Sequence, residues 1–334
     1  MSASPAPGET ACVLNGVAID DGFAEAFPMK ATRLVITAHT PDWARHAAVA
    51  ATGFATSVIA CGCEAGLERE LAPAETPDGR PGVAVLLFAM SGKELAKQVE
   101  RRVGQCVLTC PTTAVFAGLP QAPLPGQAVP AEDGTMPAPA AGDTVALGRN
   151  LRFFGDGWQA AKVIAGRRYW RVPVMDGEFV AEESTPVVKG VGGGNLLLLA
   201  RDTDAALAGA EAAVAAMRRV PGVILPFPGG VVRSGSKVGS KYPALPASTN
   251  DAFCPALAPL VARSALGPQD RCVLEIVIDG LDEAAVAAAM RAGLAAIVAR
   301  GAAAGVHRIA AGNYGGKLGP FHFHLRRLLP ETAA

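Results

Sequence analysis

A glutamate stands within one of the most apolar segments of the sequence. Residues 272–279 read CVLEIVID, and side-chain alternation along a strand puts Glu275 on one face with Val273 and Val277. A carboxyl group among valines is partly desolvated, which raises its pKa. A carboxylic acid that is neutral near pH 7 can protonate a leaving amine. The alternative is a glutamate on an edge strand that faces water or pairs with an arginine.

Three glycine-rich segments, residues 190–195, 227–242 and 312–319, lie beside apolar runs. Glycine lets a backbone approach a ligand closely and exposes its N–H groups. Polar and basic side chains in or near these segments are therefore candidates for binding a substrate. They are Asn195, Arg233, Ser234, Lys237, Ser248, Asn250, Asn313 and Lys317. No segment matches a P-loop or a dinucleotide fingerprint, and turns of a glycine-rich fold are the alternative.

Cysteines and histidines give weaker signals. The C-x-C at residues 61–63 and the C-x-x-x-C at 106–110 lack the usual zinc spacing. His322 and His324 alternate along one predicted strand face, but no carboxylate or third ligand is near them in sequence. We therefore predict no metal site. The odd number of cysteines, seven, fits reduced thiols better than a disulfide framework.

Composition narrows the class of protein. The 334 residues include 30 Lys+Arg and 30 Asp+Glu, and half are hydrophobic. This charge balance argues against nucleic acid and against an anionic membrane surface as partners. The longest apolar runs have the length of strands, far below the roughly 20 residues of a membrane-spanning helix. Because the N-terminus also lacks a signal-peptide pattern, we predict a cytoplasmic protein.

Four segments share a pattern of apolar strand, amphipathic helix and second strand. The predicted ranges are 33–39, 41–52 and 56–61; 82–90, 92–103 and 105–110; 195–200, 204–219 and 222–227; and 272–279, 282–300 and 306–312. Capping residues stand near the helix starts, namely Thr40, Ser91, Thr203 and Asp282. Two such units in each half predict an α+β fold of two ferredoxin-like split βαβ lobes, with antiparallel sheets and helices on one face.

The predicted lobes are residues 1–120 and 195–334. Residues 121–150 between them are rich in Pro, Ala and Gly, which predicts an insertion or linker loop. Residues 151–194 contain Gly-Asp-Gly and Asp-Gly turns between β-branched and aromatic residues, which predicts a hairpin extension.

Long strings occur in the order LNGVAIDDGFAEAF (14–27), ITAHTPDWA (36–44), PFPGGVVRSGSKVGS (226–240), EIVIDGLDEAAV (275–286) and AGNYGGKLG (311–319). Together with other strings between them, they resemble the formylmethanofuran–tetrahydromethanopterin formyltransferase family over roughly residues 12–328. Long collinear strings are far more specific than any single short motif.

The resemblance implies an enzyme that moves a formyl group between the amine of methanofuran, or a methanofuran-like cofactor, and N5 of tetrahydromethanopterin. It implies these two co-substrates, no metal, no tightly bound cofactor and a homo-oligomer, typically a tetramer. Glu275 matches the strand glutamate with a catalytic role in that family. The neutral, Ala- and Pro-rich composition resembles bacterial methylotroph members, which are similar to a subunit of a formyltransferase/hydrolase complex in formaldehyde oxidation. Hydrolase-type partner subunits are therefore expected.

The expected mechanism is direct transfer through a tetrahedral intermediate, with Glu275 as general acid. Backbone N–H groups or the side chains of Asn195, Ser234 or Asn250 would stabilise the oxyanion, and Arg233 and Lys237 would hold substrate carboxylates. Two alternatives stay open. One is a non-catalytic scaffold subunit of a formyl-hydrolase complex, and the other is a formyltransferase that uses another pterin.

Overall fold

The computed structural model describes residues 10–120, 143–233 and 235–329. The chain forms two compact units that are interleaved along the sequence. Unit 2 contains Met29–Ala55 and Gly62–Lys189, and unit 1 contains Met1–Pro28, Thr56–Cys61 and Gly190–Ala334. The predicted lobes are contiguous stretches, whereas these contacts group the first strands of the chain with its C-terminal half.

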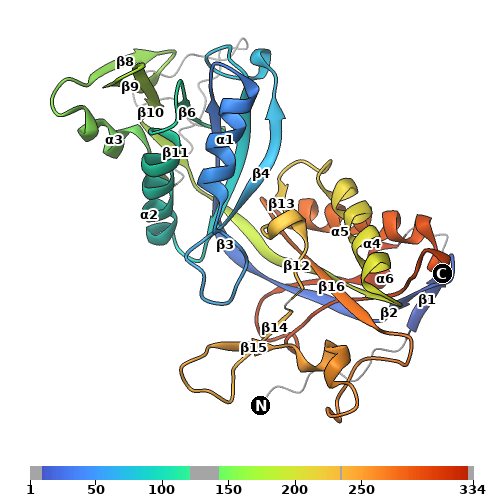
Figure 1. The fold of residues 1–334 in the computed structure, drawn as a ribbon. Coiled ribbons are helices and arrows are strands. Elements are labelled where there is room, and N and C mark those ends of the chain that lie inside the picture. The colour runs from blue at the N-terminus through green and yellow to red at the C-terminus, as the bar shows by residue number, and fades with distance from the viewer. Residues whose placement is uncertain (1–9, 121–142, 234, 330–334) are drawn as a thin grey trace, which may run out of the picture. The chain divides into compact units, whose positions relative to one another are not determined.

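Unit 2 is built on a four-stranded antiparallel sheet with two helices, which Figure 1 shows beside each other. In chain order it contains β3 (Phe23–Thr37, from Met29 onward), α1 (Pro41–Thr52), β4 (Glu64–Leu71), β5 (Gly82–Ala89), α2 (Gly92–Arg102) and β6 (Ala114–Ala117). The strand order β6–β3–β5–β4 is that of a ferredoxin-like split βαβ motif. Thr40 and Ser91 cap the two helices, as predicted, by accepting hydrogen bonds from the backbone of the first turn.

Further strands extend this sheet. Strand β10 (Gly177–Glu182) pairs in parallel with β6, and β9 (Arg167–Val174) and β8 (Ala160–Ile164) follow as two antiparallel hairpins. The predicted Asp-Gly turn joins β9 to β10 at Asp176 and Gly177, whereas β8 and β9 are joined at Ala165 and Gly166, and the Gly-Asp-Gly segment precedes β8. A small ribbon of β7 (Thr144–Ala146) and β11 (Ser184–Pro186) and the short helix α3 (Gly148–Leu151) complete the unit. Most of the predicted insertion, residues 121–142, lies outside the described residues.

Unit 1 repeats the same motif. Its strands and helices are β12 (Val188–Ala200), α4 (Thr203–Met217), β13 (Val223–Ile224), β16 (Cys272–Gly280), α5 (Glu283–Arg300) and β17 (Val306–Ala310), with the sheet order β17–β12–β16–β13. Asp202, rather than the predicted Thr203, caps α4, and Asp282 caps α5 as predicted. The prediction of an α+β fold with two ferredoxin-like lobes is confirmed.

Shorter elements surround this motif in unit 1. Strand β2 (Val17–Asp20) pairs in parallel with β17 and antiparallel with β1 (Thr10–Leu14), while β18 (Phe321–His324) pairs with the first residues of β3 and leads into α6 (Leu325–Leu328). A ribbon of β14 (Ser236–Val238) and β15 (Ala247–Thr249) lies between β13 and β16 in the chain. The short helical turns of both units are η1 (Pro73–Glu75), η2 (Val103–Val107), η3 (Arg152–Gly155), η4 (Pro228–Gly230), η5 (Asp251–Phe253), η6 (Pro255–Leu257) and η7 (Ala302–Ala304).

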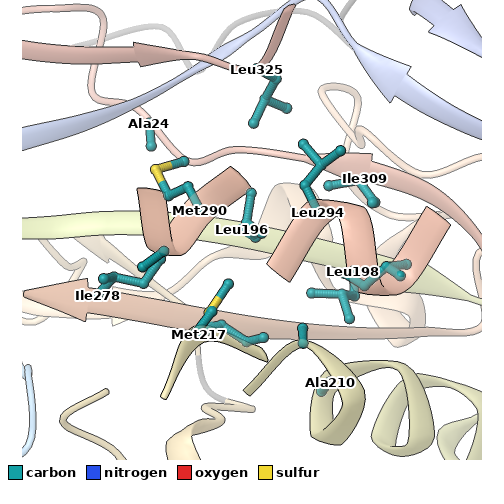
Figure 2. Close-up of a cluster of buried hydrophobic side chains, with 14 of the residues drawn as sticks. Ala24, Leu196, Leu198, Ala210, Met217, Ile278, Met290, Leu294, Ile309 and Leu325 are labelled. Atoms are coloured by element: carbon teal, nitrogen blue, oxygen red, sulfur yellow. The ribbon is translucent and has the colours of Figure 1, made fainter. Parts of the chain in front are cut away.

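The core of unit 1 lies between its sheet and its helices. Leu196 and Leu198 of β12 and Ile278 of β16 project toward Met217 of α4 and Met290 of α5, and all five are buried (Figure 2). Burying a side chain of this size contributes about 1.5–3 kcal/mol. The helix-facing residues of β12 and β16 therefore pack in the core. Residues that could contact a substrate must lie on the opposite face of these strands, where the alternate side chains point.

Two predicted strands are wrong. Residues 56–61 are apolar but form a turn, in which Cys61 N–H donates to Val58 O at 3.0 Å, and the strand that follows α1 is β4 instead. Residues 105–110 continue α2 as the π-helical turn η2, because Val103 and Val107 are both buried in the core. The strand that follows α2 is β6. The predicted strands at 222–227 and 306–312 shorten to β13 and β17.

Candidate active site

Glu275 lies on the sheet face opposite the helices of unit 1. Its neighbours in sequence, Leu274 and Ile276, are part of the helix-side core, while Val273 packs on the other side with Leu197. Leu197 of β12 is also the residue directly opposite Glu275 in the antiparallel pair. The predicted alternation along this strand is therefore confirmed.

A second chain segment closes the other edge of β16 at this point. Val232 and Glu275 exchange two backbone hydrogen bonds, of 2.9 and 3.0 Å. Gly235, three residues further on, lies so close that a β-carbon there would be 3.3 Å from Oε2 of Glu275. The carboxyl group therefore lies inside a pocket, whose lining residues are Leu197, Val232, Arg233, Gly235, Thr249, Asn250, Phe253, Cys254, Val273, Leu274 and Glu275.

The environment of Glu275 changes its acidity. Burial raises the pKa of this carboxyl from 4.5 to about 7, because an apolar pocket disfavours the charged form. Near neutral pH the group is therefore present in both protonation states, which is the property needed by a general acid or base. The side chain is not fully enclosed, since Glu275 is only half-buried.

Two predicted binding residues share this pocket. Arg233 is exposed and Asn250 is half-buried on its walls. Asn250 is held in place through its backbone, whose N–H donates to Gly235 O at 2.8 Å. A guanidinium and an amide beside a carboxylic acid can bind an anionic group and a carbonyl oxygen. Ser234, also predicted here, lies outside the described residues.

Lys237 and Ser248 make contacts within the chain. Lys237 Nζ lies 2.7 Å from Asp251 Oδ2, and Arg263 contacts the same carboxylate at 3.2 Å. The ion pair with Lys237 lowers the pKa of the Asp251 carboxyl below its ordinary value. Partial burial opposes this shift, and Arg263 adds to it. Ser248 Oγ donates to Gly239 O at 2.8 Å and so joins β14 to β15. Both residues therefore stabilise the ribbon, in contacts that the sequence did not predict.

Asn195 fixes a glycine loop. Its Oδ1 accepts from Gly312 N at 2.6 Å, and its Nδ2 donates to Gly312 O at 3.2 Å. Asn313 in the same loop accepts from Gly315 N and donates to Phe23 O, while Lys317 is exposed. The side chain of Asn195 is thus engaged by backbone, and it does not line the pocket of Glu275.

Sequence reasoning missed Glu25, a buried residue of β3. Its Oε2 accepts from Tyr314 N at 2.7 Å and from Gly316 N at 3.0 Å, and its Oε1 accepts from Gly319 N at 3.0 Å and from Leu318 N. The four donors lie about 290 positions away in sequence, so no local pattern connects them. The available signal was a lone carboxylate between alanines in a strand otherwise suited to burial.

The described residues contain neither a cluster that could bind a metal ion nor a helix that could span a membrane. Within residues 10–120, 143–233 and 235–329, no three His, Cys, Asp or Glu side chains gather closely enough to hold a metal ion. None of the helices in these ranges has the length and apolar composition needed to span a bilayer.

Comparison with known proteins identifies the family of this site. The family model described as formylmethanofuran-tetrahydromethanopterin formyltransferase matches residues 12–174, and the model described as its proximal lobe matches residues 177–328. The chain belongs to the formylmethanofuran–tetrahydromethanopterin formyltransferase family. As a member of this family, the chain is a formyltransferase, and the resemblance seen in the sequence is confirmed.

Relatives in this formyltransferase family match the chain end to end. A protein of Methylococcus capsulatus with the same family name is 62% identical over 95% of this chain and 99% of its own length. A solved structure of the formyltransferase/hydrolase complex from Methylorubrum extorquens with methylofuran contains a chain that is 52% identical, with a TM-score of 0.86 over 95% of this chain and 98% of that chain. The solved structure of the Methanosarcina barkeri formyltransferase is 46% identical to this chain in sequence. Its TM-score is 0.83, and the match covers 95% of this chain and 99% of that chain.

The acidity of Glu275 also predicts how the stability of this formyltransferase depends on pH. A folded-state pKa of about 7 lies above the ordinary value of 4.5. The native state therefore loses stability as pH rises from 4.5 through 7, relative to a variant without the group. We expect Glu275→Gln to gain up to about 3 kcal/mol on the wild type between pH 5 and pH 8, since one pKa unit corresponds to about 1.4 kcal/mol. Urea unfolding of both proteins at pH 5 and at pH 8 measures the difference in their free energies of unfolding. The same difference at both pH values would contradict the raised pKa of Glu275.

Proposed function

We propose that the chain transfers a formyl group between the amine of methanofuran, or a methanofuran-like cofactor, and N5 of tetrahydromethanopterin, with Glu275 as the general acid. One observation carries the assignment of Glu275. Its carboxyl group lies in a pocket that raises its pKa to about 7, so that it can hold a proton at neutral pH and release it to an amine.

The chemistry of the transfer defines what Glu275 must do. N5 of the pterin attacks the formyl carbon, which forms a C–N bond and moves an electron pair onto the formyl oxygen. The tetrahedral intermediate collapses by breaking the bond to the methanofuran nitrogen. Glu275 donates its proton to that nitrogen, which leaves as a neutral amine, and the resulting carboxylate accepts the proton from N5. The same steps in reverse serve the opposite direction.

The pocket residues supply the remaining roles in this proposal. Asn250 and backbone N–H groups of the segment that faces Glu275 are suited to stabilise the oxyanion. Arg233 is suited to hold a substrate carboxylate at the pocket wall. Asn195 acts in this scheme through the loop that it fixes at Gly312, and Lys237 acts through its ion pair with Asp251.

Mixing the purified chain with N-formylmethanofuran and tetrahydromethanopterin tests this proposal. The ultraviolet change that accompanies 5-formyl-tetrahydromethanopterin is the readout, and turnover by this chain is the expected result. Competition with tetrahydrofolate tests the choice of pterin. A folded chain that shows no turnover, either alone or with co-purified subunits, would favour a scaffold role or another formyl carrier.

The proposed acid gives the reaction a defined pH dependence. Because the protonated form is required, kcat/KM is expected to be constant below pH 7 and to fall about tenfold per pH unit well above it. Tyr314 stays protonated in this range, since burial and the nearby charges of Glu275 and Glu25 raise its pKa above 10. Measuring kcat/KM from pH 5.5 to 9 checks the profile. A profile that rises through pH 7 would instead make Glu275 the required base.

The assembly of the chain is also part of this proposal. The Methylorubrum extorquens relative is named as one of the subunits of a formyltransferase/hydrolase complex. Because that relative is 52% identical over 96% of this chain, we propose that this chain also associates with hydrolase-type subunits. The homotetramer that the family resemblance implies is a separate part of the proposal. Co-purification followed by mass determination in solution tests both associations. Location in the cytoplasm stays a prediction.

A further inference from the structure

One buried carboxylate anchors four backbone positions of the loop at residues 312–319, beyond the point at which Asn195 holds Gly312. Glu25 accepts four backbone hydrogen bonds from this loop, two on each oxygen, and its own backbone N–H donates to Gly312 O at 3.2 Å. The side-chain bonds of Glu25 all come from main-chain N–H groups in the part of the chain that the structure describes. The loop is therefore shaped around a negative charge, as in an anion-binding backbone nest.

The protonation state of Glu25 fits this role. Burial by itself raises the pKa of the carboxyl, but the four N–H groups outweigh it, so the pKa lies below its ordinary value. Glu25 is thus an anion at neutral pH, whereas Glu275 is present there in both protonation states, and Glu25 has no proton to give to a substrate.

The loop depends on this anchor for its conformation. Gly315 and Gly316 have φ values of 78° and 70°, which favour glycine, and Gly319 packs so closely on the backbone of Ala26 that a β-carbon would overlap Ala26 O. Few side chains of the loop are buried enough to hold it by packing. Hydrogen bonds, most of them to the carboxylate of Glu25, therefore hold this loop in its conformation.

The anchored loop carries Tyr314 toward the pocket. Its hydroxyl lies 3.4 Å from Ser236 O, to which it donates, and Ser236 follows Gly235, the residue that faces Oε2 of Glu275. The charge of Glu275 also contributes to the raised pKa of Tyr314, as expected of close neighbours. Glu25, Tyr314 and the segment beside Glu275 thus form one continuous chain of contacts.

We propose that Glu25 is a positioning residue for the formyl transfer: its carboxylate fixes the 312–319 loop and thereby holds Tyr314 against the segment that packs on Glu275. This inference rests on the proposed function. It assigns Glu25 no contact with substrate, and its effect on the reaction passes through Tyr314.

The test combines Glu25→Gln, Tyr314→Phe and the double variant. Glutamine has the shape of glutamate, but its NH₂ group cannot accept the two N–H donors that meet one carboxylate oxygen. We expect Glu25→Gln to lower kcat by about 10–100-fold with a smaller change in KM, because it displaces a group beside the reacting atoms. The double variant should be no slower than the slower single variant, since both changes act on one element. Glu211→Gln, the same change at an exposed site on α4, should behave as wild type.

Hydrogen exchange supplies a readout that is independent of activity. In Glu25→Gln, amides of residues 312–319 should exchange faster, while those of β12 and β16 keep their protection. Unchanged exchange in the loop, wild-type kcat in Tyr314→Phe, or additive losses in the double variant would each overturn the inference. If Glu25→Gln does not fold, the kcat of Tyr314→Phe still tests whether Tyr314 contributes to the reaction, and a wild-type value would overturn the inference. A wild-type chain without turnover would remove the proposed function, and the exchange result would then decide the anchoring role of Glu25.

Discussion

Glu275→Gln is expected to lower kcat by about 10²–10⁴-fold while the fold and the oligomeric state are retained. The amide fills the same space in the pocket but cannot give a proton to the leaving amine. Because the acid acts in the transition state, kcat and kcat/KM should fall together. The residual activity should also lose the decline above pH 7, since the group with the raised pKa is absent.

Steady-state kinetics of the wild type and three variants measures this effect. Glu211→Gln removes an exposed carboxylate from α4 and should leave kcat unchanged. Glu275→Asp keeps the acid but withdraws it by one methylene, so it should retain more activity than the glutamine variant. Wild-type turnover in Glu275→Gln would end the assignment of this residue as general acid.

Arg308→Met is expected to destabilise the chain by about 3–5 kcal/mol, because it leaves a buried carboxylate without its partner. Arg308 on β17 makes two hydrogen bonds to Asp20, each of 2.8 Å, and the Asp20 side chain is only 6% exposed. A third bond, from Arg308 Nη1 to Ala265 O at 2.9 Å, ties a covering loop to the sheet. Asp20 correspondingly raises the pKa of the guanidinium.

Two controls separate this effect from a general loss of charge. Arg171 of β9 pairs with Glu178 of β10 at 2.5 Å, and both side chains are exposed, so Arg171→Met should cost less than about 1 kcal/mol. Replacing both Asp20 and Arg308 with apolar residues of similar volume should restore part of the lost stability, since the buried charge of Asp20 is then removed together with its partner. Asp270, which lies 3.8 Å from Arg308, keeps its contacts with His307 and with the backbone N–H of Gly267. Urea unfolding measures all three variants. Equal losses for Arg308→Met and Arg171→Met would contradict the argument.

The sequence pattern predicted the long helices and the two ferredoxin-like motifs, but not the grouping of the first strands with the C-terminal half. Caps such as Ser91 and Asp282 satisfy the first backbone donors of a helix locally, so their signal is local too. Strand β4 was missed because EAGLEREL is polar and lacks clear alternation. Long-range contacts hold it in place, including the ion pair of Glu68 with Arg33 of β3, at 2.6 Å. Residues 56–61 show the converse, since an apolar run without a partner strand did not become a strand.

The site was only partly predictable for the same reason. Glu275 stood out because a carboxylate within an apolar strand must be desolvated, and this inference needs no knowledge of the fold. The roles of Asn195 and Lys237 depend on Gly312 and Asp251, and the role of Glu25 depends on backbone donors near the end of the chain. Such partners are set by the tertiary fold, so residue type alone does not specify them.

The interleaved units have a consequence for synthesis on the ribosome. Strands β3 and β12 each carry the chain from one unit into the other, so unit 2 is complete once residue 189 has emerged. Strands β1 and β2 are made first, yet β17, the neighbour of β2, is among the last elements made. The nascent N-terminal segment must therefore wait, with its apolar residues exposed, until translation is almost finished. We expect stalled or truncated chains to fold unit 2 alone and to depend on chaperones for the rest.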